Sequence, residues 1–272
     1  MPNIRLVALD LDGTLLDSSE RISPANRAAI ERARALGIHI VIITGRGADA
    51  PLAFGRDLGL TDPIICAHGA LTKDCPSGRE RRHIAIPREY ATALIEFAQA
   101  HSLDTAVYTG EHFHRIAGAR RYMDDMVGPL WVEVPDLIPL AEQDSTFIRF
   151  FGHDAVDAIS THFSGLPVHF KFETWGDFEE LAITSEEATK ERALAQLCGD
   201  LSIDRSEVMA IGDSRNDVPM LCWARIGVAM ANALPEVIEA APYVTAGNDE
   251  DGVARALERF VFEQGEGERR SA

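Results

Sequence analysis

The sequence predicts an α/β protein with a parallel-sheet core built from both ends of the chain and an α+β domain inserted in its middle. Three observations support this fold class. Short, continuously apolar segments, typical of buried parallel strands, occur near both ends of the 272-residue chain. A helical pattern joins the first two of these segments. The middle of the chain instead alternates apolar and polar residues, which is typical of antiparallel strands.

The first predicted strands are residues 5–9 (RLVAL) and 38–43 (IHIVII). The helix between them has Ser23 as N-cap, Pro24 at its first position and Gly37 just beyond its end. A strand, a helix and a strand at this spacing form a βαβ unit, so the two strands are expected to be parallel. The apolar segments 64–66 and 208–211 are predicted to be buried parallel strands as well.

The middle of the chain changes character near residue 81. Strands are predicted at 83–86, 105–108, 112–116, 146–151, 168–172 and 179–183, and helices at 88–101 and 154–163. From residue 185 the pattern returns to helix and strand alternation. The sequence therefore predicts a discontinuous core of residues 1–81 and 185–262 and an inserted domain of residues 82–184. Residues 263–272, rich in Gly, Glu and Arg, are expected to be a disordered tail.

Composition limits the classes of partner. The chain has 26 Lys and Arg against 43 Asp and Glu, a formal charge of -17, which repels nucleic-acid backbones and anionic lipids. We therefore expect no nucleic-acid partner and no membrane partner, and no apolar run approaches the ~20 residues of a membrane span. Four cysteines without a CxxC pair favour a reducing, cytoplasmic location. The composition does not predict an oligomeric state.

Acidic residues follow the first predicted strand. Asp10 and Asp12, in the sequence DLDGT, lie where open α/β sheets bind ligands. An ordinary acidic turn is the alternative. A calcium-binding EF-hand loop is excluded, because its glycine belongs at the sixth position, which is Leu15 here.

A second acidic segment, GDSRND, follows the apolar segment 208–211 and contains Asp213 and Asp217. Taken alone, it is also typical of a helix N-terminus with an acidic first turn. Carboxylates from two strand ends that meet at one place repel each other unless a cation lies between them, and an all-oxygen set suits Mg²⁺.

Two further candidates could bind a phosphate. Thr44 and Gly45 end the segment 38–43 and offer a hydroxyl and turn amides, although N-capping is as good an explanation. The string from Gly45 to Ala50 also matches a dinucleotide fingerprint, but this belongs on the first strand, and Pro51 is expected to disturb the next helix. Lys190, one of three lysines, lies early in a helix, where a cation gains nothing from the helix dipole. A solvated surface lysine is the alternative there.

The motifs DLDGT, TGR, TK and GDSRND, in this order, resemble the haloacid dehalogenase superfamily of aspartate-nucleophile phosphatases. The length of the insert is similar to that of the Cof-type branch, which carries a large α/β cap. The resemblance implies a Rossmann-like core and assigns residues 82–184 to a cap that sets substrate specificity.

The resemblance also implies roles for individual residues. Asp10 would be the nucleophile that forms an aspartyl-phosphate, and Asp12 the general acid and base. The phosphoryl group would be bound by four residues: Thr44, Gly45, Lys190 and Asn216. Mg²⁺ would be held by the Asp10 side chain, the Asp12 backbone carbonyl and Asp213, with Asp217 supporting them.

The chain departs from the branch at two places. Where an Asn-Gly-Ala turn is usual, it has His68-Gly69-Ala70, and we expect His68 to fill the turn rather than contact substrate. Glu191 follows Lys190 where glycine is usual. Candidate specificity residues in the insert are His112, His114, Arg115, Arg149, Lys171 and Glu173.

The function expected from these residues is Mg²⁺-dependent hydrolysis of small phosphorylated metabolites, such as sugar phosphates or similar phosphomonoesters. A phosphomutase of the same superfamily and a non-catalytic module that binds phosphorylated metabolites are alternatives. A dinucleotide-dependent oxidoreductase is a further alternative that depends on the glycine string alone.

Overall fold

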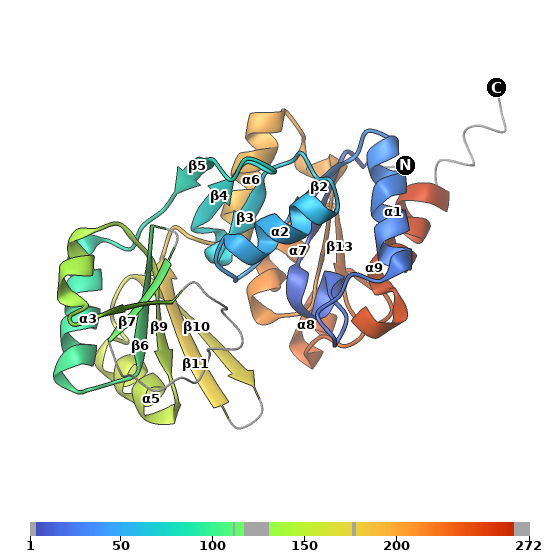
Figure 1. Ribbon diagram of the computed structural model, residues 1–272. Coiled ribbons are helices and arrows are strands. Elements are labelled where there is room, and N and C mark those ends of the chain that lie inside the picture. The colour runs from blue at the N-terminus through green and yellow to red at the C-terminus, as the bar shows by residue number, and fades with distance from the viewer. Residues whose placement is uncertain (1–3, 111, 117–130, 176–177, 264–272) are drawn as a thin grey trace. The chain divides into compact units, whose positions relative to one another are not determined.

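A computed structural model describes residues 4–110, 112–116, 131–175 and 178–263, without the side chains of 173–178 (Figure 1). The chain forms two compact units. The first comprises Met1–Arg46, Ala50–Arg81 and Thr189–Ala272, and the second comprises Gly47–Asp49 and Arg82–Ala188. Apart from Glu263, the predicted tail lies outside the described residues.

The first unit contains a parallel sheet with the strand order β14-β13-β12-β1-β2. Its members are β1 (Leu6–Leu9), β2 (His39–Ile42), β12 (Val208–Gly212), β13 (Ile226–Ala229) and β14 (Tyr243–Val244). Each neighbouring pair runs parallel. The predicted α/β core with a parallel sheet is therefore confirmed, and the strands at its centre are the continuously apolar ones.

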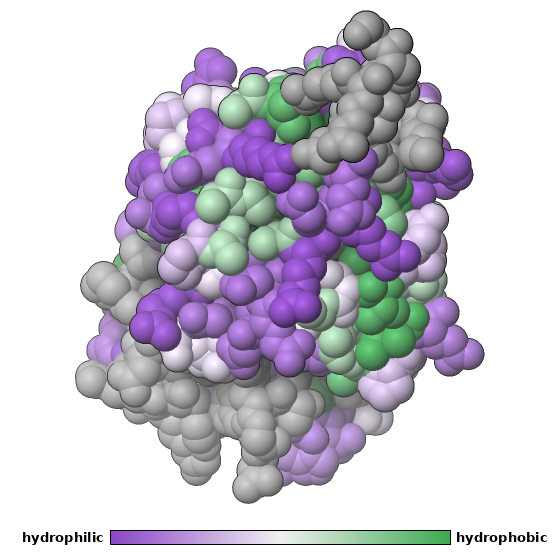
Figure 2. Space-filling model, turned by 90° about the vertical axis from the view of Figure 1, so that its right-hand side faces the viewer, coloured by the Kyte–Doolittle hydropathy of each residue, from purple (hydrophilic) through white to green (hydrophobic). Residues whose placement is uncertain are grey.

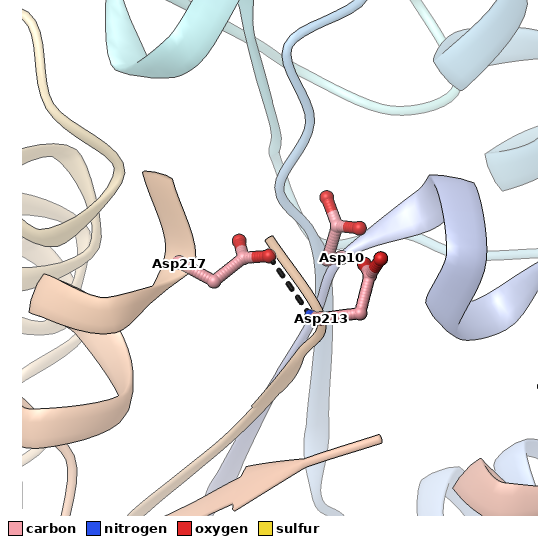
Figure 3. A group of neighbouring side chains, drawn as sticks. All are labelled: Asp10, Asp213 and Asp217. Atoms are coloured by element: carbon pink, nitrogen blue, oxygen red, sulfur yellow. Dashed lines mark hydrogen bonds between the residues drawn. The ribbon is translucent and has the colours of Figure 1, made fainter. Parts of the chain in front are cut away.

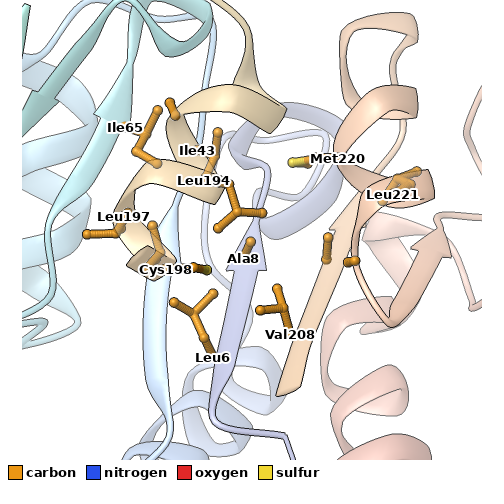
Figure 4. Close-up of a cluster of buried hydrophobic side chains, with 14 of the residues drawn as sticks. Leu6, Ala8, Ile43, Ile65, Leu194, Leu197, Cys198, Val208, Met220 and Leu221 are labelled. Atoms are coloured by element: carbon orange, nitrogen blue, oxygen red, sulfur yellow. The ribbon is translucent and has the colours of Figure 1, made fainter. Parts of the chain in front are cut away.

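Helices cover both faces of this sheet (Figure 1). On one face, α6 (Lys190–Leu201), α7 (Val218–Trp223) and α8 (Pro235–Ala240) contribute to a buried cluster with strand residues such as Leu6, Ala8 and Val208 (Figure 4). Helix α1 (Pro24–Ala35) packs against α9 (Gly252–Leu257), outside this cluster. Because Val7 and Leu9, which alternate with Leu6 and Ala8, are also fully buried, neither face of the central strand is open to water.

Two helix starts show what the local sequence can specify. Helix α1 begins as predicted, with the Asn26 backbone amide donating to Ser23 Oγ (3.1 Å) and Pro24 at its first position. The expectation that Pro51 disturbs a helix is wrong, because α2 spans Asp49–Asp57. Pro51 lies in the first turn, where a backbone N–H has no intrahelical acceptor, so its missing hydrogen costs little.

The strand predicted at 64–66 does not join the parallel sheet as a full member. As β3 (Ile64–Cys66) it pairs antiparallel with β4 (Leu71–Lys73), which pairs in turn with β5 (Glu80–His83). Only an isolated parallel bridge between Ile43 and Ile65 connects β3 to the end of β2. The chain reverses directly after β3, which places β4 beside it. The strand predicted at 83–86 is β5, which begins and ends three residues earlier.

The second unit has the mixed pattern expected from its alternating sequence. Its sheet has the order β10-β11-β9-β6-β7-β8, from β6 (Thr105–Thr109), β7 (His112–Ile116), β8 (Trp131–Val134), β9 (Ser145–Phe151), β10 (Val168–Trp175) and β11 (Phe178–Ser185). All neighbouring pairs are antiparallel except β7 and β8. Helices α3 (Arg88–Ala100) and α5 (His153–His162) share a core with Val107, Ile148 and Leu181.

Hydrophilic residues predominate on the face shown in Figure 2, with smaller hydrophobic areas between them. Among the described residues, no helix is both long enough and apolar enough to cross a lipid bilayer.

Candidate active site

Three neighbouring strands bring the predicted motifs to one edge of the sheet. Asp213 follows β12, Asp10 follows β1, and Thr44 lies just beyond β2, in the strand order β12-β1-β2. The register pairs Leu9 with both Ile211 and Ile42, so the three strands end at the same level. Because the strands are parallel, their carboxyl ends share one edge, and segments some 200 residues apart meet there.

Three carboxylates converge at this edge. Asp10, Asp213 and Asp217 each offer one oxygen, and these oxygens lie within 4.8 Å of one another (Figure 3). Asp10 and Asp217 are buried, whereas Asp213 is partly exposed. The Thr14 hydroxyl donates to Asp213 Oδ1 (3.0 Å) and fixes the orientation of that carboxylate.

Lys190 bridges two of the three carboxylates. Its Nζ donates to Asp10 Oδ1 and to Asp217 Oδ1, at 2.6 Å in each case, and its side chain is 2% exposed. Burial alone would lower the pKa of Lys190, but the charges of Asp10 and Asp217 raise it above its ordinary value. The ammonium group is therefore charged, and the alternative of a solvated surface lysine is excluded.

Asp217 supports the loop on which Asp213 lies. While its Oδ1 accepts from Lys190, its Oδ2 accepts from the backbone amides of Asp213 (3.1 Å) and Ser214 (2.9 Å). Both oxygens of Asp217 are thus engaged within the protein. Asp217 therefore links Lys190 to the backbone of the Asp213 loop.

The electrostatics of the carboxylates favour a cation. Burial, and then the charge of Asp217, raise the pKa of Asp10 well above its ordinary value despite the opposing effect of Lys190. The same two causes raise the pKa of Asp213 to about 6. Carboxylates that are costly to ionise without a cation, and that present only oxygen, fit a hard divalent ion such as Mg²⁺.

Asp12 points its carboxylate elsewhere, to a partner that the sequence analysis missed. Arg46 donates to it from Nε, at 2.9 Å to Oδ2 and 3.1 Å to Oδ1, and also from Nη2. The Nη2 atom also reaches Glu20 (3.3 Å). The signal was present in the sequence, because Arg46 is the third residue of the TGR motif, but nothing in its spacing identified its acidic partner.

The other predicted phosphate-binding residues lie around the same edge. Thr44 is 1% exposed, and its Oγ1 accepts from the Arg46 backbone amide (3.1 Å). The Asn216 side-chain amide donates to His68 Nδ1 (3.2 Å). His68 lies in the turn after β3, as expected, and its ring lies against Gly45.

Among the candidate specificity residues of the second unit, Arg149 pairs with the buried Glu180 (3.0 Å), and Arg115 with Glu133 (3.1 Å). The rings of His112 and His114 are 6.4 Å apart. Lys171 is paired through β10 with Ala182. The Glu173 side chain lies outside the described part of the chain.

The chain is similar in sequence to known hydrolases and phosphatases. Residues 7–257 match the family of haloacid dehalogenase-like hydrolases. The chain is 29% identical to the phosphatase YwpJ of Bacillus subtilis, with 95% of this chain and 100% of that protein covered. It is 28% identical to the pyridoxal phosphate phosphatase YbhA of Escherichia coli, with 93% and 97% covered.

The fold is similar to solved structures as well. A haloacid dehalogenase-like hydrolase from B. subtilis superposes with a TM-score of 0.82 at 27% identity, covering 95% of this chain and 100% of that one. These findings confirm the expectation of a hydrolase of the phosphatase type and the suspected family. The chain belongs to the haloacid dehalogenase-like hydrolases.

Proposed function

We propose that the protein is a Mg²⁺-dependent phosphatase that hydrolyses small phosphomonoesters through a phosphoryl group carried on Asp10. The observation that carries this proposal is the convergence of Asp10, Asp213 and Asp217 at the carboxyl ends of β1 and β12, where the buried Lys190 bridges Asp10 and Asp217. One nucleophilic carboxylate, one cation of the protein and a set of oxygens for a metal are the parts that phosphoryl transfer needs.

In the first half of the reaction, an oxygen of Asp10 attacks phosphorus and the bond to the leaving oxygen breaks. Asp12, protonated, gives its proton to that oxygen, and the alcohol departs. In the second half, Asp12 takes a proton from a water molecule whose oxygen attacks phosphorus. The bond to Asp10 then breaks, inorganic phosphate leaves, and both carboxyl groups regain their starting forms.

Arg46 orients the ionised form of Asp12, which takes the proton from water in the second half of this scheme. Its contacts from Nε and Nη2 fix the plane of the Asp12 carboxylate. Such a two-point contact restrains Asp12 more than a single hydrogen bond would.

The metal would be held by the side chains of Asp10 and Asp213 and by the backbone carbonyl of Asp12, with Asp217 fixing the Asp213 loop. When bound, Mg²⁺ would neutralise the charge that the carboxylates and the phosphoryl oxygens bring together. Lys190 adds a positive charge beside Asp10, and Thr44, the Gly45 amide and Asn216 would donate to the phosphoryl oxygens.

We assign recognition of the phosphoryl group and choice of the rest of the substrate to different parts of the chain. The residues around Asp10 recognise a phosphoryl group, and we assign the choice of the remaining group to the insert, residues 82–184. Sugar phosphates and comparable phosphomonoesters are the proposed substrates. Pyridoxal phosphate is included because a relative is named for it.

All four cysteines are free thiols, which supports a cytoplasmic location.

Phosphate release from a panel of sugar phosphates, nucleotides, phosphoglycolate and pyridoxal phosphate, with Mg²⁺ and with EDTA, tests the proposal. We expect Mg²⁺-dependent release, which Asp10→Asn lowers by about a thousandfold or more. The matched control is Asp200→Asn, which changes an exposed carboxylate of α6 and is expected to keep full activity. Full activity in Asp10→Asn, or equal activity in EDTA, would contradict the proposal.

A further inference from the structure

A single turn contacts each loop that carries a predicted phosphate-binding residue. The turn, Ala67–Gly69, lies between β3 and β4. The Ala67 amide donates to the Arg46 carbonyl (2.8 Å), and the His68 amide donates to the Thr44 carbonyl (3.0 Å). These two bonds tie the turn to the loop that presents Thr44 and Gly45.

The same turn also rests on the start of α6. A Cβ placed on Gly69 would lie 2.2 Å from the Thr189 carbonyl oxygen and 3.0 Å from the Lys190 amide nitrogen. No side chain fits in that space, so the backbone of the turn approaches the first residues of the helix directly. The position of Lys190 is therefore coupled to the turn through backbone contact.

The His68 ring contacts both the Gly45 backbone and the Asn216 side chain. It is 1% exposed. A Cβ placed on Gly45 would lie 2.4 Å from His68 Cε1, so the ring lies directly against the Gly45 backbone. The Asn216 Nδ2 group donates to His68 Nδ1 (3.2 Å). That group carries two hydrogens, so one bond to His68 leaves a second donor for a phosphoryl oxygen.

The backbone of the turn is strained. Ala67 and His68 have φ values of 50° and 56°, in the left-handed region that residues with a Cβ rarely adopt, and Gly69 follows at 102°. Consecutive residues in this region persist only where their surroundings hold them, and such strain is common at functional sites. Here the surroundings are the loops of Thr44, Asn216 and Lys190.

We propose that His68 is a positioning residue for the phosphoryl group: its ring orients the Asn216 amide and fixes the Gly45 backbone, so that both can donate to phosphoryl oxygens. This inference rests on the proposed function, because it takes Asn216 and Gly45 to be donors to the phosphoryl group of a substrate. It does not require His68 to touch the substrate.

Two histidine variants test the inference. His68→Gly removes the ring and suits the left-handed backbone, and His68→Ala removes the ring while keeping a Cβ, which Ala67 carries at a φ of 50° in the same turn. They are compared with Asn216→Ala, with the double variant His68→Gly/Asn216→Ala, and with His153→Asn as a control at an exposed histidine. The measurements are kcat/KM, the inhibition constant of inorganic phosphate in the presence of Mg²⁺, and the melting temperature.

We expect both histidine variants to raise the inhibition constant of inorganic phosphate about tenfold, the size of one lost hydrogen bond to a charged group. They should also lower kcat/KM while still unfolding cooperatively. Because His68 acts through Asn216 and Gly45, the double variant should fall short of the product of the two single losses. His153→Asn should match the wild type.

Inhibition constants within twofold of wild type in the folded histidine variants would overturn the inference, and so would losses that multiply in the double variant. Failure of both histidine variants to fold would overturn it too, since His68 would then be needed for the fold itself. A wild-type protein that binds inorganic phosphate but hydrolyses nothing would contradict the proposed function alone, and phosphate affinity would still decide the role of His68. A wild-type protein that neither hydrolyses nor binds phosphate would contradict both.

Discussion

Lys190 holds two buried carboxylates that would otherwise repel each other. Its contacts to Asp10 and Asp217 are equal in length, and the three side chains are at most 6% exposed. A buried ion pair owes much of its apparent strength to the cost of leaving one member alone. Removal of the ammonium group therefore affects both stability and chemistry.

We predict that Lys190→Met lowers the free energy of unfolding by about 3 kcal/mol in metal-free protein. Arg215→Met is the matched control, because Arg215 pairs with Glu236 at the surface, where a lost ion pair costs much less than a buried one. Chemical denaturation of the three proteins measures both values. Equal losses in the two variants would show that Lys190 makes no special contribution to the site.

The pKa of Asp213 leads to a pH-dependent prediction. Its folded-state pKa is raised from 3.8 to about 6, so ionisation of Asp213 favours the unfolded chain. The contribution of this group to stability is present below pH 3.8 and is lost as the pH rises through about 6. A cation bound beside the carboxylate would restore it.

Asp213→Asn should therefore become more stable than the wild type as the pH rises towards neutrality without metal, by on the order of 3 kcal/mol. Added Mg²⁺ should stabilise the wild type and leave the variant nearly unchanged. Denaturation curves across the pH range, with EDTA and with Mg²⁺, measure the difference. A difference in stability between wild type and variant that stays constant at every pH would show that ionisation of Asp213 does not destabilise the folded protein.

Among single residues, the sequence analysis found the members of short motifs and missed their partners. Asp10, Asp213 and Lys190 could be singled out because each lies at a strand end or helix start. The partners of Asp12 and Asn216, which are Arg46 and His68, depend on how two turns fold back on the sheet. No spacing along the chain encodes those contacts.

At the scale of elements, the strand ends and one helix cap build the site. Strands β1, β2 and β12 needed only continuous apolar character to be predicted, because a strand buried on both faces has no other pattern. Elements of two to four residues at sheet edges, such as β8 and β14, carry too few residues for a periodic signal. The antiparallel pairing of β3 follows from the reversal at Ala67–Gly69, which the local sequence does not reveal.

The N-cap of α6 is expected to affect both the stability of the protein and its activity. The Thr189 hydroxyl accepts from the Arg192 amide (3.1 Å), and the next residue is Lys190. We predict that Thr189→Ala lowers stability by about 1 kcal/mol and also lowers kcat/KM, because the start of the helix positions Lys190. Ser23→Ala, which removes the equivalent cap of α1 and also the bond from the Ser23 hydroxyl to Asp251, should cost at least as much stability without lowering activity. Equal activity in the two variants would contradict a role for this cap in catalysis.

For the whole molecule, the acidic charge makes local compensation necessary. With a formal charge of -17, the chain repels a phosphorylated substrate unless cations gather where it binds. Lys190 is one such cation, and the proposed metal is the other. The fold class and the antiparallel pattern of the insert followed from the periodicity of the sequence, whereas no motif in the insert identifies a substrate.

The central claim is that Asp10 carries the phosphoryl group during turnover. Rapid acid quenching of the protein with substrate and Mg²⁺, followed by mass spectrometry of the peptide that contains Asp10, tests it most directly. The account predicts a phosphoryl group on Asp10 that appears within the first turnover, decays as substrate is exhausted, and is absent from Asp10→Asn. Steady release of phosphate with an unmodified Asp10 peptide at every quench time would contradict it.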